Sequence, residues 1–312
     1  MDKTNFGNTS LSVSKLCFGT LTVGPLQAKF GIPRAVKVFE YAWERGINFF
    51  DSAELYGTQP YIGALPNHIR HEAVVVTKSY SDTADKMRES VEKSLREMKL
   101  DSIPVYLLHE QESALTLSGH RRALDVLLEY KQKGLIQVLG VSTHTVEVSR
   151  VVRLFPELEV IFSMHNIEGY GIKDGTREDM EDELKQDYEA GLGVYLMKSL
   201  GGGKLLHRAR EALEYSRDYP YAHSVAIGMK DEREVDYNVD LFEGNEPTTS
   251  SIGAVERQIF VSFWCKGCGD CVSACPQGAI SIVDEKAFID HNKCVLCTYC
   301  VDQCPERALR IV

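Results

Sequence analysis

The chain has few features of a nucleic-acid-binding protein or a membrane protein. Its 35 Lys and Arg residues are outnumbered by 45 Asp and Glu residues, which gives the 312-residue chain a formal net charge of −10. Nucleic-acid binding usually depends on clustered Lys and Arg. A membrane span requires about 20 mostly apolar residues in a row, and no part of this sequence approaches that length. We therefore expect neither a nucleic-acid partner nor a membrane partner.

Cysteine is scarce outside the last 48 residues, which contain eight of the nine cysteines. The exception is Cys17, which lies in the apolar stretch 13–18. Small buried thiols are common in protein cores, so we predict that Cys17 is a core residue and not a ligand. Disulfide bonds would indicate an exported chain, but residues 1–5 lack the apolar segment of a signal peptide. We therefore expect reduced thiols and a cytoplasmic location.

The eight remaining cysteines follow one pattern, Cys-x2-Cys-x2-Cys-x3-Cys-Pro, which occurs twice with a shift of 29 positions. In this arrangement the three closely spaced cysteines bind one iron–sulfur cluster, and the cysteine before the proline binds the other cluster. The pattern therefore predicts two [4Fe–4S] clusters. Their expected ligands are Cys265, Cys268, Cys271 and Cys304 for the first cluster, and Cys294, Cys297, Cys300 and Cys275 for the second.

Zinc is a weaker interpretation of these cysteines, because zinc sites usually consist of two separated Cys pairs. The segment resembles a bacterial two-cluster ferredoxin over about 58 residues, and this resemblance implies electron transfer. A segment of this size buries little apolar surface, so the clusters would also stabilise its fold. The two roles are compatible, and the sequence does not separate them.

Residues 1–240 alternate between short β-like runs and helical patterns. In residues 83–100, apolar side chains recur at steps of three and four, which is typical of one face of a helix. Thr176 and Asp179 predict a capping box at the start of another helix, and Gly191 marks its end. The expected strands are 16–18, 47–50, 73–76, 105–108, 138–141, 160–162, 194–197 and 224–227.

Eight strand–helix units in about 240 residues predict a (β/α)8 TIM barrel. An open doubly wound sheet is less favoured, because no Gly-x-Gly-x-x-Gly follows the first expected strand. The predicted fold is therefore of the α/β class. It consists of a barrel over residues 1–240, a linker over 241–253 and a small α+β ferredoxin-like domain over 254–312.

Four chemically distinct side chains follow three successive strands of the predicted barrel. Asp51 ends the second strand and Tyr56 lies in the loop after it, while Lys78 ends the third strand and His109 the fourth. Catalytic side chains of such barrels lie at the carboxyl ends of strands, so these four would meet at one rim. A single His at a strand end is more often structural, but the set of four is not easily explained in that way.

Several segments around these residues resemble the aldo-keto reductase family. The resemblance implies a hairpin that closes the barrel floor, and a catalytic tetrad formed by the four side chains named above. The segments that carry it are Phe6-Gly7-Asn8-Thr9, Gly46-Ile47-Asn48-Phe49-Phe50-Asp51-x4-Tyr56-Gly57, Val76-Thr77-Lys78, Tyr106-Leu107-Leu108-His109 and Gly140-Val141-Ser142.

The tetrad suits the reduction of a carbonyl group. A free phenol has a pKa of about 10, and a neighbouring Lys78 ammonium is expected to lower the pKa of Tyr56 by ~1–3 units. Tyr56 would then act as a general acid or base, while Asp51 would keep the lysine charged. His109 would orient the carbonyl and share its developing charge.

The resemblance also implies a nicotinamide dinucleotide lying across the barrel rim. Residues after the fifth strand would bind its carboxamide, and the glycine-rich turn 197–203 would bind its pyrophosphate. A plain connector without a ligand is the alternative for this turn, and FMN is a second candidate for its phosphate site. The implied cofactor contacts are Thr20, Ser142, Thr143, Lys198, Gly201, Gly202, Lys230 and Asn238.

Three positions depart from the family pattern. Met197 stands where many relatives stack an aromatic ring on the nicotinamide, and no amide side chain is present around Phe162. Glu234 lies near the position of an arginine that binds the 2′-phosphate of NADP in relatives, and a carboxylate would repel that group. If a nicotinamide is used, we therefore expect NADH rather than NADPH.

We expect an aldo-keto reductase that acts on a small aldehyde or ketone and exchanges electrons through its clusters. The alternatives are a nicotinamide-independent reductase fed by a ferredoxin or another redox partner, with or without flavin, and a redox-sensing module. The 13-residue linker 241–253 can span about 43 Å at ~3.3 Å per residue. We therefore expect the ferredoxin domain to dock near the barrel mouth, where it would partly serve as a lid.

Overall fold

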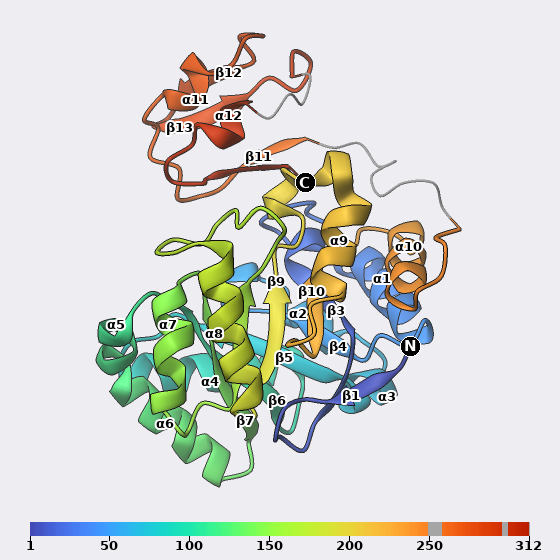
Figure 1. Ribbon diagram of the computed structural model, residues 1–312, viewed down its shortest axis with the longest axis vertical. Coiled ribbons are helices and arrows are strands. Elements are labelled where there is room, and N and C mark those ends of the chain that lie inside the picture. Colours follow the sequence, from blue (N-terminus) through green and yellow to red (C-terminus); the bar gives the residue numbers. More distant parts are fainter. Residues whose placement is uncertain (249–257, 295–298, 312) are drawn as a thin grey trace.

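Eight parallel strands form a closed barrel in the computed structural model, which describes residues 1–248, 258–294 and 299–311 (Figure 1). The strands follow one another around the barrel in chain order, and the last pairs with the first. This confirms the predicted (β/α)8 barrel and its eight strands. Their bounds are β3 (Leu16–Gly19), β4 (Phe49–Asp51), β5 (Val74–Ser79), β6 (Ile103–Gln111), β7 (Ile136–Thr143), β8 (Val160–Met164), β9 (Gly193–Met197) and β10 (Ser224–Ile227).

Helices surround the barrel, and their apolar faces pack against the strands. Thr176 caps its helix as predicted, because its hydroxyl accepts the Asp179 N–H while the Asp179 carboxylate accepts the Thr176 N–H. No helix in the described part of the chain is both long and apolar enough to cross a membrane. The α-helices of this region are α1 (Ile32–Glu44), α2 (Gln59–Gly63), α3 (Asn67–Glu72), α4 (Ala84–Met98), α5 (Ala114–Gly119), α6 (Arg121–Gln132), α7 (Val146–Val151), α8 (Arg177–Glu189), α9 (Ala209–Arg217) and α10 (Glu232–Phe242), and the 3₁₀ turns are η1 (Thr20–Val23), η2 (Glu54–Tyr56), η3 (Val152–Leu154), η4 (Gly201–Gly203) and η5 (Leu206–Arg208).

A hairpin of β1 (Lys3–Asn5) and β2 (Ser12–Ser14) closes one end of the barrel. Phe6 in its turn is fully buried, and its ring lies 5.3 Å from that of Phe49 inside the barrel. Cys17 is fully buried in the same inner core, as predicted. Because the hairpin fills this end, a ligand must enter at the other end, where the strands finish.

The C-terminal domain consists of two copies of one small unit, in agreement with the repeat in the sequence. The helices α11 (Asp270–Ser273) and α12 (Tyr299–Asp302) begin 29 positions apart, as do the strands β12 (Ile280–Val283) and β14 (Leu309–Ile311). β12 pairs with β13 (Lys286–Ile289), and β14 pairs with β11 (Ile259–Val261), both in antiparallel register. Cysteines make up a large part of the small core of this domain, so whatever they bind also holds the domain together.

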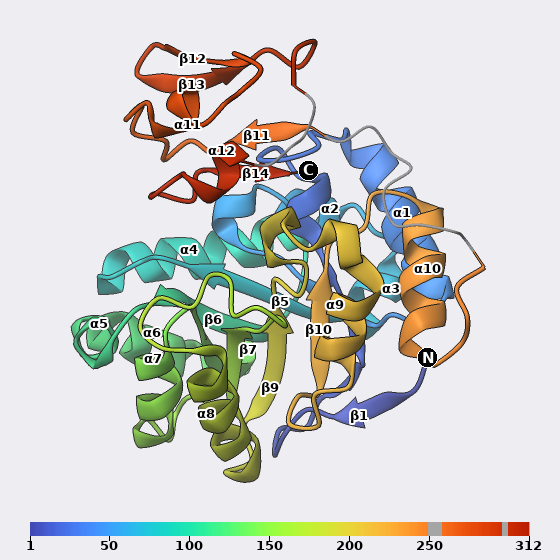
Figure 2. The ribbon, with the colours of Figure 1, turned by 45° about the horizontal axis from the view of Figure 1, so that its top comes forward.

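The C-terminal domain lies over the barrel mouth, at the carboxyl ends of the strands (Figures 1 and 2). Its last strand, β14, contacts the turn η4 that follows β9. This is the position that we expected from the length of the linker. Helix α10 continues to Phe242, two residues beyond the expected end of the barrel, and Glu246 forms an ion pair with Arg210 at 2.6 Å. Residues 249–253 of the expected linker lie outside the described residues.

The contact between the two domains predicts different effects for two neighbouring glycines of η4. A Cβ atom on Gly203 would lie 2.8 Å from Cβ of Ile311, whereas a Cβ atom on Gly202 would meet nothing within 4 Å. Both residues have positive φ, so alanine strains the backbone at either position. We expect Gly203→Ala to increase amide hydrogen exchange in β14 several-fold, and Gly202→Ala to leave it nearly unchanged. Equal exchange of β14 in the two variants, measured by mass spectrometry under anaerobic conditions, would contradict this packing.

Candidate active site and cluster-binding pocket

An ion pair between Asp51 and Lys78 lies at the base of the barrel mouth. Lys78 Nζ donates to Asp51 Oδ2 at 2.8 Å and to the main-chain oxygen of Ser52 at 2.7 Å, and both charged side chains are almost fully buried. Burial raises the pKa of the Asp51 carboxyl and lowers that of the Lys78 amine, while the attraction between the two charges opposes both shifts. The strand ends thus bring together the acid and the amine that the sequence predicted as a pair.

Tyr195 is a third member of this group, and the sequence analysis missed it. Its hydroxyl donates to Asp51 Oδ1 at 2.9 Å, and its ring stacks on Phe162 with centroids 3.9 Å apart. The alternation along β9 places Tyr195 inside the barrel. That inward position was visible in the sequence, but its contact with a strand 144 residues away was not.

Tyr56 and His109 lie above the ion pair. Lys78 Nζ is 4.8 Å from the centroid of the Tyr56 ring, and the His109 ring packs edge-on against the same ring at 5.7 Å. Burial lowers the pKa of His109 well below its usual value, and the Lys78 and Lys198 charges lower it further, so the imidazole is neutral. His109 Nδ1 is buried and has no hydrogen-bond partner among the described residues.

The predicted lowering of the Tyr56 pKa is wrong. Burial raises the pKa of this phenol well above its usual value, and the carboxylates of Asp51 and Glu110 raise it further. The positive charge that opposes this rise is that of Arg310, in the C-terminal domain. We attribute the difference to the ion pair itself, because the Asp51 carboxylate largely cancels the field of Lys78.

A second polar group lies beside the tetrad at the same mouth. Lys198 Nζ is 3.2 Å from His144 Nε2, and that nitrogen is 3.6 Å from Glu110 Oε1. Tyr80 donates to Glu110 Oε2 at 2.5 Å and stacks on His109 with ring centroids 4.2 Å apart. Of this group the sequence analysis predicted only Lys198, although Glu110 and His144 also lie at strand ends and the same argument would have found them.

Most of the residues expected to hold a nicotinamide dinucleotide are engaged within the barrel. Thr20 and Thr143 are fully buried, and each hydroxyl donates to a main-chain carbonyl, at 2.9 and 2.8 Å. The Ser142 hydroxyl accepts a main-chain N–H at 2.8 Å, and Asn238 is buried and donates to a carbonyl of its own helix. Lys230 is 8% exposed. The Thr20 and Thr143 hydroxyls are thus engaged, whereas Asn238 Oδ1 has no partner among the described residues, and the nucleotide contacts stay a prediction.

Two further features bear on the nucleotide. Gly201 and Gly202 belong to the turn η4, which contacts β14 of the C-terminal domain, so the expected pyrophosphate site is partly covered. The Glu234 carboxylate accepts the Lys230 N–H at 2.8 Å and is 7% exposed. It faces the start of its own helix rather than solvent. The preference for NADH over NADPH, which was based on repulsion between this carboxylate and a 2′-phosphate, stays a prediction.

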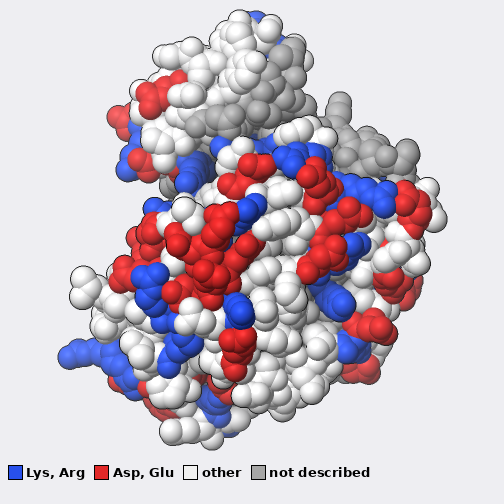
Figure 3. Space-filling view, viewed as in Figure 1, with Lys and Arg blue, Asp and Glu red and all other residues white. Residues whose placement is uncertain are grey.

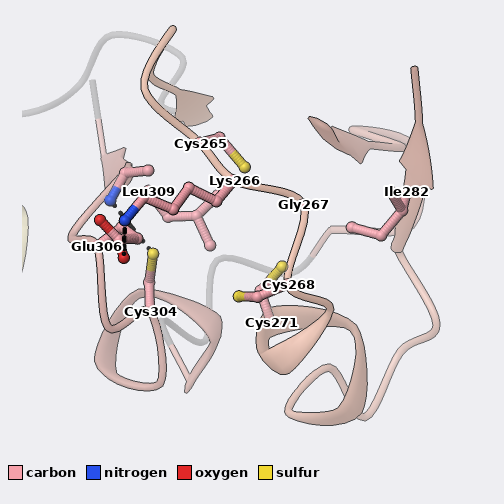
Figure 4. A pocket seen from close by; sticks show the side chains of 10 residues that line it. Cys265, Lys266, Gly267, Cys268, Cys271, Ile282, Cys304, Glu306 and Leu309 are labelled. Atoms are coloured by element: carbon pink, nitrogen blue, oxygen red, sulfur yellow. Dashed lines mark hydrogen bonds and ion pairs between the residues drawn. The ribbon is translucent and has the colours of Figure 1, made fainter. Parts of the chain in front are cut away.

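Four cysteines line one pocket of the C-terminal domain, and they are the four predicted for the first cluster. Figure 4 shows the sulfur atoms of Cys265, Cys268, Cys271 and Cys304 around a common space. Within the described part of the chain, no three His, Cys, Asp or Glu side chains are close enough together to hold a single metal ion. These four residues are the three closely spaced cysteines of one repeat and the cysteine before the proline of the other, which is the ligand set expected for an iron–sulfur cluster.

Main-chain N–H groups donate to the sulfur atoms of both predicted ligand sets. Ala308 donates to Cys304 at 3.2 Å, and Ala279 donates to Cys275 at 3.3 Å, which are equivalent positions of the repeat. Hydrogen bonds of this kind stabilise thiolate and tune the reduction potential of a bound cluster. In the second set, Cys275, Cys294 and Cys300 pack in the same small core, whereas Cys297 lies outside the described residues.

Comparisons with known families match both parts of the chain. A model of the Aldo/keto reductase family matches residues 15–243, and a model of the 4Fe-4S dicluster domain matches residues 264–309. L-galactose dehydrogenase from Arabidopsis thaliana is 26% identical over 246 residues, which are 72% of this chain and 75% of that protein. An uncharacterised oxidoreductase of Bacillus subtilis is also 26% identical, over 66% of this chain and 68% of its own length.

Solved structures agree with the barrel fold. A putative aldo-keto reductase from Pseudomonas aeruginosa has a TM-score of 0.67 and 24% identity, covering 78% of this chain and 95% of that chain. The holo form of an aldo-keto reductase from Bacillus halodurans has a TM-score of 0.66 and 20% identity, covering 81% of this chain and 93% of that chain. At these identities the likeness concerns the fold alone.

The crossed arrangement of the cysteines predicts which variants lose the same cluster. We expect Cys304→Ser and Cys271→Ser to lose one cluster with the same electron paramagnetic resonance signal, and Cys275→Ser to lose the other. Each variant should fall from about eight to about four iron atoms per chain, while Cys17→Ser keeps its full iron content. If Cys304→Ser instead reproduced the spectrum of Cys300→Ser, the predicted ligand sets would be wrong.

The contact of Tyr195 with Asp51 predicts a loss of stability that depends on pH. Tyr195→Phe removes a hydroxyl donor from Asp51 Oδ1, an oxygen that keeps its 2.8 Å contact with Lys78 Nζ, and we expect a cost of about 1 kcal/mol. Burial already raises the pKa of Asp51, and losing this donor should raise it further, so the loss of stability should be largest at pH 8, where the carboxyl is ionised, and should shrink as the carboxyl is protonated on acidification. Unfolding measured between pH 5 and pH 8 tests this.

Tyr41→Phe is the matched control for that measurement. It removes a hydroxyl–carboxylate hydrogen bond of 2.8 Å, to Asp236, which lies on the helical surface of the barrel. We expect a change of less than about 1 kcal/mol for this partly exposed contact. If the two variants lost equal free energy of unfolding at every pH, a special role for Tyr195 would be excluded.

Proposed function

Because the chain belongs to the aldo/keto reductase family, we propose that it reduces a small aldehyde or ketone at the mouth of its barrel. The observation that carries this proposal is the buried Asp51–Lys78 ion pair, with its 2.8 Å contact, below Tyr56 and His109. Keeping two charges in a protein interior is costly. A barrel that served only as a scaffold would not need this pair.

Tyr56 is proposed as the proton donor. Reduction of a carbonyl to an alcohol requires two electrons and two protons, and a bound nicotinamide would supply two electrons and one proton as a hydride. Since its pKa is raised, the phenol keeps its proton at neutral pH and can transfer it to the carbonyl oxygen. The charge of Arg310, which opposes the rise of the Tyr56 pKa, then helps to stabilise the phenolate that is left behind.

His109 is proposed to orient the substrate. Its imidazole is neutral, and its buried Nδ1 has no partner among the described residues, so one ring nitrogen can donate to the carbonyl while the ring stays fixed between Tyr56 and Tyr80. A neutral donor is suitable here, because it stabilises the developing negative charge without giving up its own proton.

The clusters are proposed to carry electrons between the barrel and an external redox partner, such as a ferredoxin. When bound, they would supply single electrons, and their thiolate ligands fit the reducing conditions of a cytoplasmic location. A redox-sensing module is less well supported, because sensing alone would not require the tetrad. FMN has no support from the comparisons with known proteins.

A nicotinamide-independent reductase is the second candidate, and one observation favours it. Aldo/keto reductases generally use NAD(P)H, but here β14 covers the turn that would hold the pyrophosphate, and most of the expected nucleotide contacts are engaged elsewhere. In this alternative both electrons arrive one at a time through the clusters, Tyr56 donates one proton to the carbonyl oxygen, and solvent supplies the second proton to carbon.

Turnover of the anaerobic holoprotein with a panel of aldehydes and ketones tests the proposal. NADH, NADPH and a reduced ferredoxin are each supplied as the sole electron donor. We expect Tyr56→Phe to reduce turnover by about 10²–10⁴-fold with whichever donor is active, without loss of iron. Tyr61→Phe, which removes a buried hydroxyl bonded to a main-chain oxygen at 2.7 Å, is the control. Full activity of Tyr56→Phe would exclude the proposed proton donor.

A further inference from the structure

The C-terminal domain contributes a cation to the barrel mouth. β14 pairs with β11, and Leu309 of β14 faces the small core of the C-terminal domain. Side chains alternate along a strand, so Arg310 projects from the opposite face, toward the barrel. The charge of Arg310 acts on Tyr56 and Glu110, both of which lie at the mouth. Figure 2 shows β14 above the carboxyl ends of the barrel strands.

Arg310 is held in place by an aromatic ring, and it has no acidic partner among the described residues. Its guanidinium carbon lies 4.6 Å from the ring centroid of Trp264, which fixes its direction. The side chain is half-buried, and no ion pair or hydrogen bond of its guanidinium occurs within residues 1–248, 258–294 and 299–311. Arginine cannot lose its proton at physiological pH. A half-buried charge in this state is costly unless an anion joins it.

The barrel presents a second cation to the same space. Lys198 follows β9, and its amine contacts His144, at 3.2 Å, rather than a carboxylate. Burial lowers the pKa of Lys198 to about 7, and the charge of Arg310 contributes to this shift. The two cations therefore act on each other across the domain boundary. Figure 3 shows a notch between the domains on the face of Figure 1, with Lys and Arg side chains beside it.

The backbone conformation at Lys198 and Glu110 supports a functional role for the polar side chains at the mouth. Lys198 has φ of +61° and Glu110 has φ of +46°, a left-handed conformation that is unfavourable for residues other than glycine. Both residues flank His144 at the mouth. Strained non-glycine residues of this kind persist where the surrounding structure requires a particular side-chain direction, and they often lie at ligand sites.

We propose that Arg310 and Lys198 together bind an oxyanion group of the ligand reduced at the tetrad. This inference rests on the proposed function and adds a substrate class to it: small carbonyl compounds that carry a carboxylate or phosphate, such as 2-oxo acids. The charge of Glu110 acts on both cations, but no ion pair of either one occurs among the described residues, so a bound anion would be their direct partner. The C-terminal domain thus completes the substrate site, with Arg310 as a specificity-determining residue.

Binding of non-reactive probes tests the site without turnover. Oxamate and inorganic phosphate are titrated calorimetrically into the anaerobic holoprotein, with the uncharged oxamide as the control ligand. We expect oxamate to bind, and Arg310→Gln to weaken it at least about 10-fold, or about 1.4 kcal/mol, with partial recovery in Arg310→Lys. Arg88→Gln, which removes a surface arginine paired with Glu129, should change nothing. Unchanged iron content shows that each variant is folded.

The pH dependence of oxamate binding provides a second readout. The amine of Lys198 is faced by Arg310, Arg307, Lys173, Glu110 and His144. Because its pKa is about 7, oxamate affinity should fall as the pH rises from 6 to 8, and Lys198→Gln should remove this dependence. Binding that is independent of pH in the unsubstituted protein would overturn the role of Lys198.

The outcomes separate this inference from the proposed function. Arg310-dependent oxamate binding in a protein that reduces no carbonyl would support the site and contradict the function. Reduction of neutral and anionic carbonyls with equal kcat/KM, with no oxamate binding, would support the function and overturn the site. If AMP or pyrophosphate displaced oxamate while substrate charge did not affect kcat/KM, the oxyanion would belong to a nucleotide, and the substrate class would be wrong.

Discussion

The buried ion pair between Asp51 and Lys78 is the constraint on which the rest of the site depends. Removing two charges from water costs several kcal/mol for each ion, and this cost is offset only if geometry and additional hydrogen bonds are favourable. Here those conditions depend on strand register, since Asp51 must pair with Val76 of the next strand for the amine to reach it. A shift of one residue would turn the carboxylate to the helical side of the barrel. The site therefore exists only in the correctly closed barrel.

Patterns that are local in the chain could be predicted from the sequence. The eight strands, the Thr176 cap and the cysteine repeat each depend on residues that are close together, and the topology of a barrel then places the strand-end residues on one rim. Glu110 and His144 were missed although they lie at strand ends, but the other missed features depend on distant partners. Tyr195 reaches Asp51 across 144 positions, and the cation that opposes the rise of the Tyr56 pKa belongs to another domain. The effect of Lys78 on the pKa of Tyr56 was predicted wrongly for a related reason. The electric field of Lys78 at Tyr56 depends on how completely the Asp51 carboxylate cancels it.

The short strand β14 links the two functional parts of the molecule. Leu309 lines the pocket of the first predicted cluster, Arg310 projects to the barrel mouth, and Ile311 packs near Gly203 of the turn η4. Consecutive residues of a strand are about 3.3 Å apart, so the wall of the cluster pocket and the mouth are adjacent. Such proximity suits electron exchange between the two parts, and it also explains why the turn η4, the predicted pyrophosphate site, is partly covered.

The position of Cys304 on the same stretch of chain has a consequence for maturation. Cys304 lies six positions before Arg310, and its sulfur lines the pocket whose filling organises this small domain. In a newly made chain that has not yet acquired iron, the barrel would therefore be folded while the C-terminal domain over its mouth would not yet be organised. If Arg310 completes the substrate site as proposed, that site would lack its anion-binding arginine until the clusters are assembled, and loss of the clusters would displace the arginine again without altering the barrel.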